Sequence, residues 1–206
     1  MLDLKDVSKK YGRTIILNDI TSRFEPGVTV ITGPSGVGKS TLLRLCATVE
    51  KQSSGVIEWQ GSPLRKSPAF RRALGYAPQR IDFPEDLSAI DFMLHVAALK
   101  RLPLGSAKAQ CLSILDRLGL SRDANKPIAT WSGGMRRRLG VAQAFLGSPE
   151  VLIFDEPTAE LDSDSAQHVN ALIFEAAEHA VVLMTTHLES HLSDYDYQTL
   201  RLEPPQ

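Results

Sequence analysis

Short runs of largely apolar residues alternate along the chain with longer segments in which apolar residues recur every three or four positions. The runs at 28–32, 151–154 and 181–184 predict strands of a parallel sheet that is covered on both faces. The spacing within 42–49, 87–98, 107–118, 135–146 and 166–176 predicts helices with one apolar face each. Strands that alternate with helices in this way indicate an α/β protein with a mostly parallel sheet.

The N-terminal quarter has a strand-like pattern of its own. Leu2, Leu4 and Val7 predict a first strand with one buried face. Further strands are expected at 15–17, 21–24 and 56–59, and another at 75–79 that stops at Pro78. Residues 9–13 are expected to form a turn that exposes an aromatic side chain.

The composition is that of an ordinary globular protein. The 206 residues carry a net charge of −1, and 43% of them are hydrophobic. No excess of positive charge is present to drive sequence-independent nucleic-acid binding, and the apolar runs are too short to cross a bilayer. The start has no signal-peptide pattern. Cys46 and Cys111 lack metal-ligand spacing, so we expect free core thiols and a cytosolic protein.

One glycine-rich stretch lies between a predicted strand and a predicted helix. It has the spacing of the phosphate-binding loop and consists of Gly33, Pro34, Ser35, Gly36, Val37, Gly38, Lys39, Ser40 and Thr41. Glycines let the backbone wrap around an anion, and the free N–H groups at the helix start point toward it. Lys39 adds a mobile positive charge, and Ser40 offers a hydroxyl to a magnesium ion that bridges the phosphates. Because both flanks fit, a nucleotide site is favoured over a glycine-rich turn with a solvated lysine.

Two carboxylates follow the buried run at 151–154. Asp155 and Glu156 are expected at the carboxyl end of a strand, where open α/β sheets bind their ligands. One of them can hold magnesium while the other orients and deprotonates a water molecule. The plainer alternative is a polar strand end that faces solvent.

A serine and two glycines open the helix predicted after residue 131. Ser132, Gly133 and Gly134 offer free N–H groups, as at the first loop, and therefore indicate a second anion site. Three arginines follow at 136–138, and their charge opposes the helix dipole. This suggests a nearby anion, although a solvated basic face explains the arginines equally well. Two copies packed head to tail would need both cradles, since each would close over the nucleotide of the other.

In this combination and order the motifs resemble the nucleotide-binding domain of ATP-binding-cassette (ABC) proteins, over almost the whole chain. The resemblance implies that Tyr11 stacks on adenine and that Gln79 contacts magnesium and the attacking water. It implies that Asp155 belongs to the magnesium shell and that Glu156 is the general base. His187 corresponds to the switch histidine that holds the γ-phosphate.

The resemblance also implies a fold and a dimer. Ser132, Gly133 and Gly134 match the signature motif that serves the opposite protomer's site, and Asp162 matches the dimer-contact loop. The implied magnesium ligands are Ser40, Gln79 and Asp155. The implied architecture is a single P-loop ABC ATPase domain over 1–206. It has a RecA-like, mostly parallel core, a small antiparallel β subdomain, and a helical subdomain inserted at approximately 84–145.

The function implied is that of an ATP-binding and ATP-hydrolysing subunit that powers transport through a separate permease. Its ligands are ATP and Mg²⁺. Its partners are a second ATPase copy and an integral-membrane permease, which would dock on the surface after Gln79 that holds Arg80, Ile81, Phe83 and Pro84. No nucleic acid is expected as a partner. The implied location is cytoplasmic, peripheral at the inner face of the cell membrane. Met135 with the three arginines, together with residues 96–100, looks most like ABC-2-type export ATPases.

Three positions depart from the family pattern. Trp131 replaces a leucine, Met135 replaces a glutamine, and Glu160 brings a carboxylate to a loop that prefers a small residue. If that loop faces the partner's nucleotide, the added charge weakens dimer closure. A cassette that binds ATP but hardly hydrolyses it is therefore one alternative. A P-loop kinase and a soluble ABC ATPase acting on nucleic acid or ribosomes are the others. The transported substrate is not indicated, because the membrane partner selects it.

Overall fold

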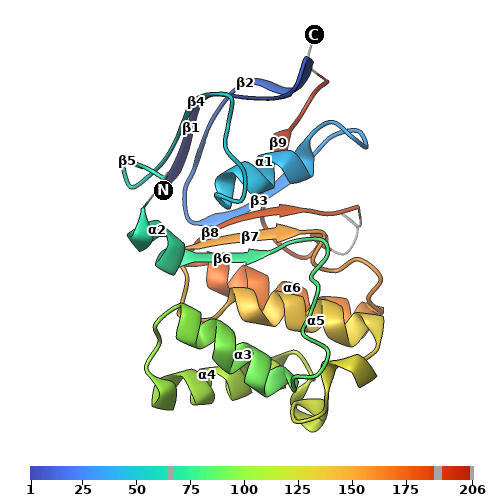
Figure 1. Cartoon of the computed structure of the whole chain (residues 1–206). Coiled ribbons are helices and arrows are strands. Elements are labelled where there is room, and N and C mark those ends of the chain that lie inside the picture. Colours follow the sequence, from blue (N-terminus) through green and yellow to red (C-terminus); the bar gives the residue numbers. More distant parts are fainter. Residues whose placement is uncertain (65–66, 188–191, 205–206) are drawn as a thin grey trace.

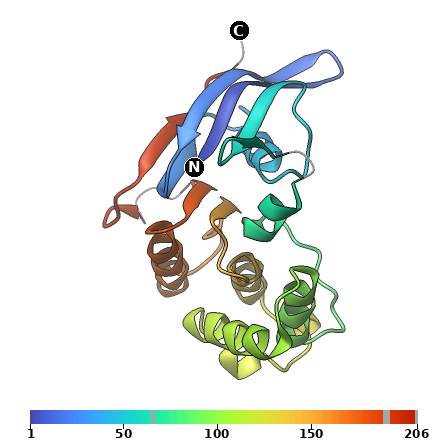
Figure 2. The ribbon, with the colours of Figure 1, turned by 90° about the vertical axis from the view of Figure 1, so that its left-hand side faces the viewer.

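Two sheets lie on either side of helix α1 (Lys39–Cys46) in the computed structural model of the protein (Figure 1). The structure describes residues 1–64, 67–187 and 192–204. The antiparallel sheet is at the top of Figure 1, α1 lies beneath it, and the parallel sheet follows. Two further layers of helices lie below the parallel sheet, and Figure 2 shows the same stacking from the side.

The antiparallel sheet has the strand order β2-β1-β4-β5. These strands are β1 (Leu2–Tyr11), β2 (Thr14–Phe24), β4 (Ser54–Trp59) and β5 (Ser62–Pro63). The expected turn at 9–13 is wrong in part, because β1 continues to Tyr11 and pairs it with Thr14. The segments 15–17 and 21–24 are one strand rather than two. Register shifts along β1 let this long pair bend without breaking.

The parallel strands have the order β6-β7-β8-β3-β9. They are β3 (Gly27–Thr32), β6 (Leu74–Ala77), β7 (Val151–Asp155), β8 (Val181–Thr185) and β9 (Gln198–Arg201). The predictions for β3, β6, β7 and β8 are confirmed. The edge strand β9 was not predicted, because its residues are mostly exposed and polar and carry no apolar run.

Alternate residues of the central strands serve two separate cores. Val151 and Ile153 of β7 pack toward α1 and the antiparallel sheet, together with Leu2 and Leu43. Their neighbours Leu152 and Phe154 belong to the core on the opposite face, among the helices. The period of two along the strand thus explains why 151–154 is apolar throughout.

Helices α5 (Gly133–Ala144) and α6 (Ser163–Ala177) cover the lower face of the parallel sheet, and α3 (Ala89–Leu99) and α4 (Leu104–Arg117) pack against α5 (Figure 1). Two 3₁₀ turns, Ser121–Asp123 and Ile128–Thr130, join α4 to α5. The short helix α2 (Pro68–Ala73) was not predicted, since Phe70 is its only buried residue.

The helix start expected at Ser132 and the core cysteines are confirmed, and Ser88 and Gly119 mark two further helix ends. The Ser88 and Ser132 hydroxyls accept backbone N–H groups of α3 and α5, and Gly119 follows α4 with φ of 67°. Cys46 and Cys111 are buried and unbridged. Within the described ranges, no helix is both long and apolar enough to reach across a bilayer.

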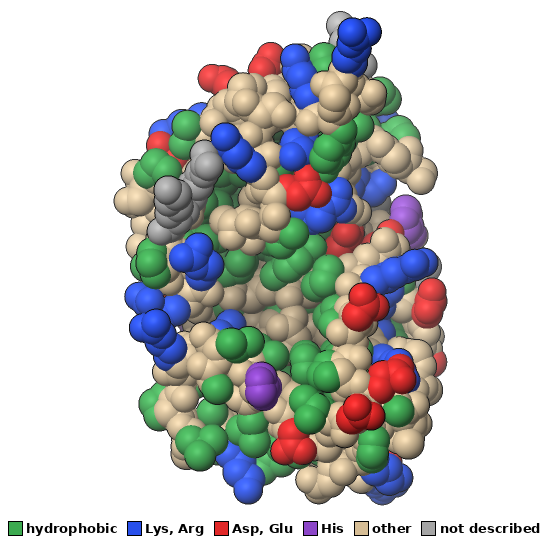
Figure 3. Space-filling model, viewed as in Figure 1, with side chains coloured by type: hydrophobic (Ala, Val, Ile, Leu, Met, Phe, Trp, Pro, Cys, Tyr) green, Lys and Arg blue, Asp and Glu red, His purple; other side chains and the backbone are tan. Residues whose placement is uncertain are grey.

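Charge is unevenly distributed on the face seen in Figure 1. The space-filling view shows basic side chains gathered along its left-hand edge and acidic ones over the lower right (Figure 3). The exposed residues Asp82, Glu85 and Asp86 belong to the segment that leads from β6 to α3. This segment runs down the right-hand side of Figure 1, beside the carboxyl ends of the parallel strands.

Candidate nucleotide site

The predicted phosphate loop connects β3 to α1 as an open turn. Gly33, Gly36 and Gly38 have φ of 137°, 78° and 110°, which side chains other than glycine rarely adopt. A Cβ atom on Gly33 would lie 2.5 Å from the Leu202 carbonyl oxygen. The glycine therefore allows the C-terminal segment to approach the loop closely.

Lys39 folds back over this loop from the first turn of α1. Its Nζ donates to the carbonyl oxygens of Gly33 at 2.8 Å and Pro34 at 3.1 Å. Ser40 is half-buried one residue further along. The helix start thus offers free N–H groups, one amine and one hydroxyl, which is the donor set that a polyphosphate requires.

Three neighbouring parallel strands bring the other predicted polar residues together. Gln79 follows β6, Glu156 follows β7 and His187 follows β8. Gln79 Nε2 donates to Glu156 Oε2 at 3.2 Å, and His187 Nε2 lies 3.0 Å from Glu156 Oε1. Because the carboxyl ends of parallel strands meet at one edge, Gln79, which is 77 positions from Glu156 in sequence, and His187, from the next strand, converge on a single carboxylate.

Thr185 was not among the predicted site residues, yet it organises both carboxylates. Its Oγ1 donates to Asp155 Oδ1 at 2.6 Å and accepts the backbone N–H of Glu156 at 3.0 Å. Asp155 is only 4% exposed, and Glu156 has φ of 54°. This hydroxyl stabilises the left-handed turn that directs Glu156 away from the strand. The available signal was a polar Thr-Thr-His ending to the apolar run at 181–184.

The serine and glycines of the predicted second cradle lie at the exposed start of α5. Ser132 Oγ accepts the Met135 N–H at 3.2 Å, which caps the helix. A Cβ atom on Gly133 would meet nothing within 4 Å, and one on Gly134 would meet only Leu161, at 3.5 Å. Trp131 is 5% exposed in the helical core. The indole Nε1 is buried without a hydrogen-bond partner among the residues that the structure describes, and the Ser132 cap beside it is nevertheless formed.

The three arginines of α5 all have partners within the chain. Arg136 donates to Glu85 at 3.0 Å, Arg137 donates to the Gln79 carbonyl, and Arg138 donates to Ser165 Oγ. The cluster is therefore not a freely solvated face, although Arg136 Nε and Arg138 Nε are buried without a hydrogen-bond partner in the described part of the chain. Its hydrogen bonds connect α5 to the segment after β6 and to the start of α6.

Asp162 caps α6 at the end of the predicted dimer-contact loop. Its carboxylate accepts the Ser165 N–H at 2.8 Å and the Ser165 hydroxyl at 2.9 Å. These hydrogen bonds, aided by the charge of Arg138, lower the pKa of Asp162. Glu160 precedes it in an exposed left-handed turn with φ of 63°. Glu160 and Gln79 both line a cleft of about 320 Å³ that also reaches Gly133 and Arg137.

Tyr11 lies toward the other end of α1, at the end of β1. It is 44% exposed, and its hydroxyl donates to Glu50, which follows α1. Lys9 Nζ lies 4.7 Å from the centroid of its ring. Tyr11 is thus an oriented surface aromatic ring that lies apart from the Glu156 cluster.

The residues expected to hold magnesium are chemically suited to it. The carboxylate of Asp155, the amide oxygen of Gln79 and the hydroxyl of Ser40 are the hard oxygen donors that this ion prefers. Among the described residues, no three His, Cys, Asp or Glu side chains form a metal cluster. The donor set therefore fits an ion that is held largely by nucleotide phosphates, with one carboxylate from the chain.

Comparisons with known proteins agree on one family. A family model described as ABC transporter matches residues 17–159. The lantibiotic transport ATP-binding protein SrtF of Streptococcus pyogenes is 31% identical over 205 residues, covering 95% of this chain and 85% of SrtF. The glutamate/aspartate import ATP-binding protein GltL of Escherichia coli is 34% identical over 191 residues, covering 89% and 79%. The dimeric structure of MJ0796, described as a bacterial ABC transporter cassette, superposes with a TM-score of 0.86 at 24% identity, covering 98% and 97%.

Proposed function

Because the chain belongs to the ABC transporter family, it is an ATP-binding ATPase subunit of ATP-driven transport, and we propose that it powers export through a separate membrane permease. The observation that carries this proposal is the shared sheet edge. The phosphate loop precedes α1 there, and Gln79 and His187 converge on Glu156 from neighbouring strands.

The proposed roles follow from this geometry. Lys39 and backbone N–H groups of the phosphate loop, in which Pro34 has none, bind the phosphates of ATP, and Tyr11 stacks on adenine. Ser40, Asp155 and Gln79 would hold magnesium, which would neutralise charge on the transferred phosphoryl group. Glu156 takes the proton of the attacking water, and His187 positions the γ-phosphate. General-base catalysis of this kind contributes typically about 10²–10⁴-fold.

The second cradle is proposed to act in the opposite protomer's site. Ser132, Gly133 and Gly134 lie at an exposed helix start, and Asp162 lies in the loop beside them. In the head-to-tail dimer that we propose, each of these helix starts closes over the partner's γ-phosphate. The dimeric form of the structurally similar MJ0796 supports this arrangement.

The permease is proposed to dock on the segment after Gln79. Arg80 and Pro84 are exposed there, and Ile81 and Phe83 are half-buried beside the cleft. The exposed carboxylates of Asp82 and Asp86 favour a cytoplasmic permease helix that carries positive charge, whereas Glu85 is already paired with Arg136. Segment 84–145 then acts as the helical subdomain that contacts the permease, within one ATPase domain over 1–206. This places the subunit at the inner face of the cell membrane.

Export is favoured over import by the residues of the signature helix. Met135 followed by three arginines, with residues 96–100, resembles ABC-2-type export ATPases, and SrtF is named for lantibiotic transport. Co-purification from detergent extracts tests this part of the proposal. We expect a permease of the export type, and recovery of an import permease, or of no membrane protein, would contradict it.

The ATPase mechanism is tested by Glu156→Gln, which keeps the side chain's shape and removes its basicity. We expect turnover to fall by about 10²-fold or more, while MgATP stays bound and the dimer accumulates in light-scattering measurements. Glu178→Gln is the control, since Glu178 is exposed at the end of α6 and is not one of the proposed site residues. Undiminished single-turnover cleavage by Glu156→Gln would remove Glu156 from the role of base.

A further inference from the structure

A chain of hydrogen-bonded side chains joins the two ends of the proposed nucleotide site. Thr41 belongs to the phosphate loop, and its Oγ1 accepts a hydrogen bond from the Arg44 guanidinium at 3.1 Å. Arg44 Nε donates to Glu50 Oε1 at 2.6 Å. Glu50 Oε2 accepts the hydroxyl proton of Tyr11. The path therefore runs without a break from the phosphate loop to the ring proposed to hold adenine.

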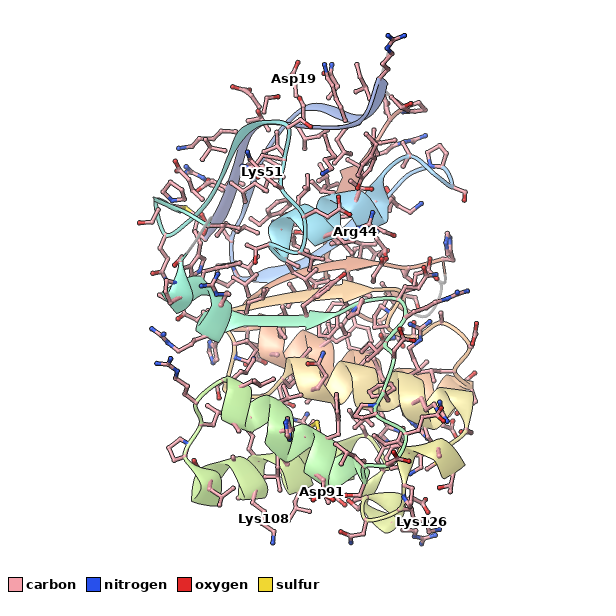
Figure 4. All side chains as sticks on the ribbon, viewed as in Figure 1. Asp19, Arg44, Lys51, Asp91, Lys108 and Lys126 are labelled. Carbon is pink, nitrogen blue, oxygen red and sulfur yellow. The ribbon has the colours of Figure 1, made fainter. Side chains whose placement is uncertain are left out.

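The backbone holds Glu50 in place as firmly as its side-chain partners do. The N–H groups of Val49 and Glu50 both donate to the Arg44 carbonyl, at 3.0 and 3.2 Å. Thr48 has φ of 57°, which turns the chain back at the end of α1. Figure 4 labels Arg44 on α1 and Lys51 just beyond its end. The backbone at Glu50 is thus anchored to the helix that starts at the phosphate loop.

Lys9 restrains the same aromatic ring from one side. Its side chain is only 12% exposed, and its Nζ lies 3.1 Å from Glu50 Oε2 and 2.8 Å from the Lys51 carbonyl oxygen. The amine covers one face of the Tyr11 ring at 4.7 Å from the centroid. Since Tyr11 remains 44% exposed, the opposite face is the one available to a base.

The Glu50 carboxylate is ionised at neutral pH. Burial raises its pKa, but hydrogen bonds from Tyr11, Arg44 and Lys9 outweigh burial and lower the pKa to about 2. Hydrogen bonds to an ionised acceptor are stronger than those between neutral groups. The Tyr11 hydroxyl is accordingly held by a carboxylate that is charged at neutral pH.

We propose that Glu50 is a positioning residue for nucleotide binding, which holds Tyr11 in its stacking orientation and ties that orientation to the phosphate loop through Arg44. The inference rests on the proposed function, because stacking of adenine on Tyr11 belongs to it. An aromatic ring fixed before binding does not lose rotational freedom when the base arrives. Glu50 therefore strengthens binding of the base without touching the nucleotide.

The test measures MgADP and magnesium tripolyphosphate binding by isothermal titration calorimetry. ADP contains the base, whereas tripolyphosphate reports on the phosphate loop alone. We expect Glu50→Ala to weaken ADP binding about three- to tenfold, the effect of releasing one immobilised side chain, and to leave tripolyphosphate binding within about twofold of wild type. Tyr11→Phe removes only the hydroxyl and should match Glu50→Ala. The double variant should bind ADP no more weakly than either single variant does.

Matched variants separate the inference from the function on which it rests. Glu58→Ala breaks only the 2.6 Å ion pair with Lys5 in the same sheet and should bind ADP like wild type. If Glu50→Ala binds ADP normally while Tyr11→Ala binds it weakly, the positioning role is wrong and the nucleotide site stands. If Glu50→Ala weakens both ligands equally, its role is general folding and the inference is again wrong. If neither Lys39→Ala nor Tyr11→Ala affects ADP binding, the proposed site itself is wrong.

Discussion

Individual residues at the sheet edge show how one hydroxyl can order a site. Thr185 bonds the Asp155 carboxylate and the Glu156 backbone N–H together, so the two acidic residues face different directions. Adjacent carboxylates on an ordinary strand would also point to opposite faces, but the turn at Glu156 brings its side chain to Gln79 and His187. The proposed division of labour between magnesium binding by Asp155 and proton abstraction by Glu156 thus follows from a backbone turn.

Glu160 is the residue whose chemistry conflicts most with the proposed dimer. It is exposed in a left-handed turn, one residue before the loop's Leu161, and lines the same cleft as Gly133. A carboxylate facing the partner's triphosphate repels it, and like-charge contacts at an interface oppose association.

We therefore expect Glu160→Gln to strengthen the MgATP-dependent dimer of the Glu156→Gln variant by about three- to tenfold, equivalent to roughly 1 kcal/mol. Sedimentation velocity at several protein concentrations gives the dissociation constant. The strengthening should fade as salt rises, because salt screens exposed charges. An unchanged constant at low salt would mean that Glu160 does not face the nucleotide across the interface.

At the scale of the elements, the close approach of β6 to α5 depends on a glycine. A Cβ atom on Gly75 would lie 2.0 Å from the Ala144 carbonyl oxygen and 2.7 Å from Leu152 Cδ2. The backbone of α5 cannot yield as a flexible side chain would, so overpacking at this position strains both elements.

Gly75→Ala should accordingly lower the free energy of unfolding by about 1–3 kcal/mol, measured by urea denaturation. Gly105 in α4 is the matched control, because a Cβ atom there meets nothing within 4 Å. Gly105→Ala should be neutral or stabilising by about 0.5–1 kcal/mol. Equal effects of the two variants would contradict the close packing of β6 on α5.

The junction of α3 and α5 contains a partly buried amine. Lys100 Nζ donates to the Leu146 carbonyl at 2.6 Å, and burial lowers the pKa of Lys100 to about 8 from an ordinary value of 10.5. Between these two pH values the unfolded chain binds more protons at this group than the folded chain. The contribution of Lys100 to the free energy of unfolding therefore rises as pH increases from 8 to 10.5. Below pH 8 the folded protein holds the amine in its charged form in a partly buried position, which lowers stability.

The difference in unfolding free energy between wild type and Lys100→Met isolates this effect from the other titrating groups. We expect the difference to shift in favour of wild type by about 1–3 kcal/mol between pH 8 and 10.5, allowing for partial solvent screening. Denaturation curves at both pH values measure it. Lys108→Met, on the neighbouring helix α4, should show no such shift, and a flat difference for Lys100→Met would contradict the lowered pKa.

Elements with a strong hydrophobic period could be predicted from the sequence, and weak ones could not. The apolar run 151–154 predicted β7 because both of its faces are buried, whereas β9 is an exposed edge strand with no apolar signal. Asp155 and Glu156 were correctly expected at the carboxyl end of a buried strand. Thr185 and Glu50 were missed because their importance lies in hydrogen bonds to distant residues, and residue spacing along the chain does not encode such contacts.

At the scale of the whole molecule, one chain holds the two half-sites that we propose, the phosphate loop and the start of α5. The phosphate loop and the start of α5 both lie on the right-hand side in Figure 1, with the parallel sheet between their levels. In the proposed head-to-tail dimer, each complete site takes the phosphate loop from one chain and the second cradle, Ser132 to Gly134, from the other. This arrangement predicts that two differently damaged chains can restore a site together.

Lys39→Ala removes the positive charge of the phosphate loop, and Gly133→Asp places a negative charge in the second cradle. Asp fits at Gly133 because the position is open and an acidic side chain at a helix start stabilises the helix, yet it repels a triphosphate. Each variant alone should be inactive, under conditions that support wild-type turnover and with the permease present if turnover requires it. An equal mixture should recover about a quarter of wild-type activity, because half of the dimers are mixed and each mixed dimer has one intact site. A chain that carries both substitutions, mixed with wild type, controls for simple dilution. If the mixture of single variants stays inactive although mixed dimers form, the second cradle does not act across the dimer, and each chain completes its own site.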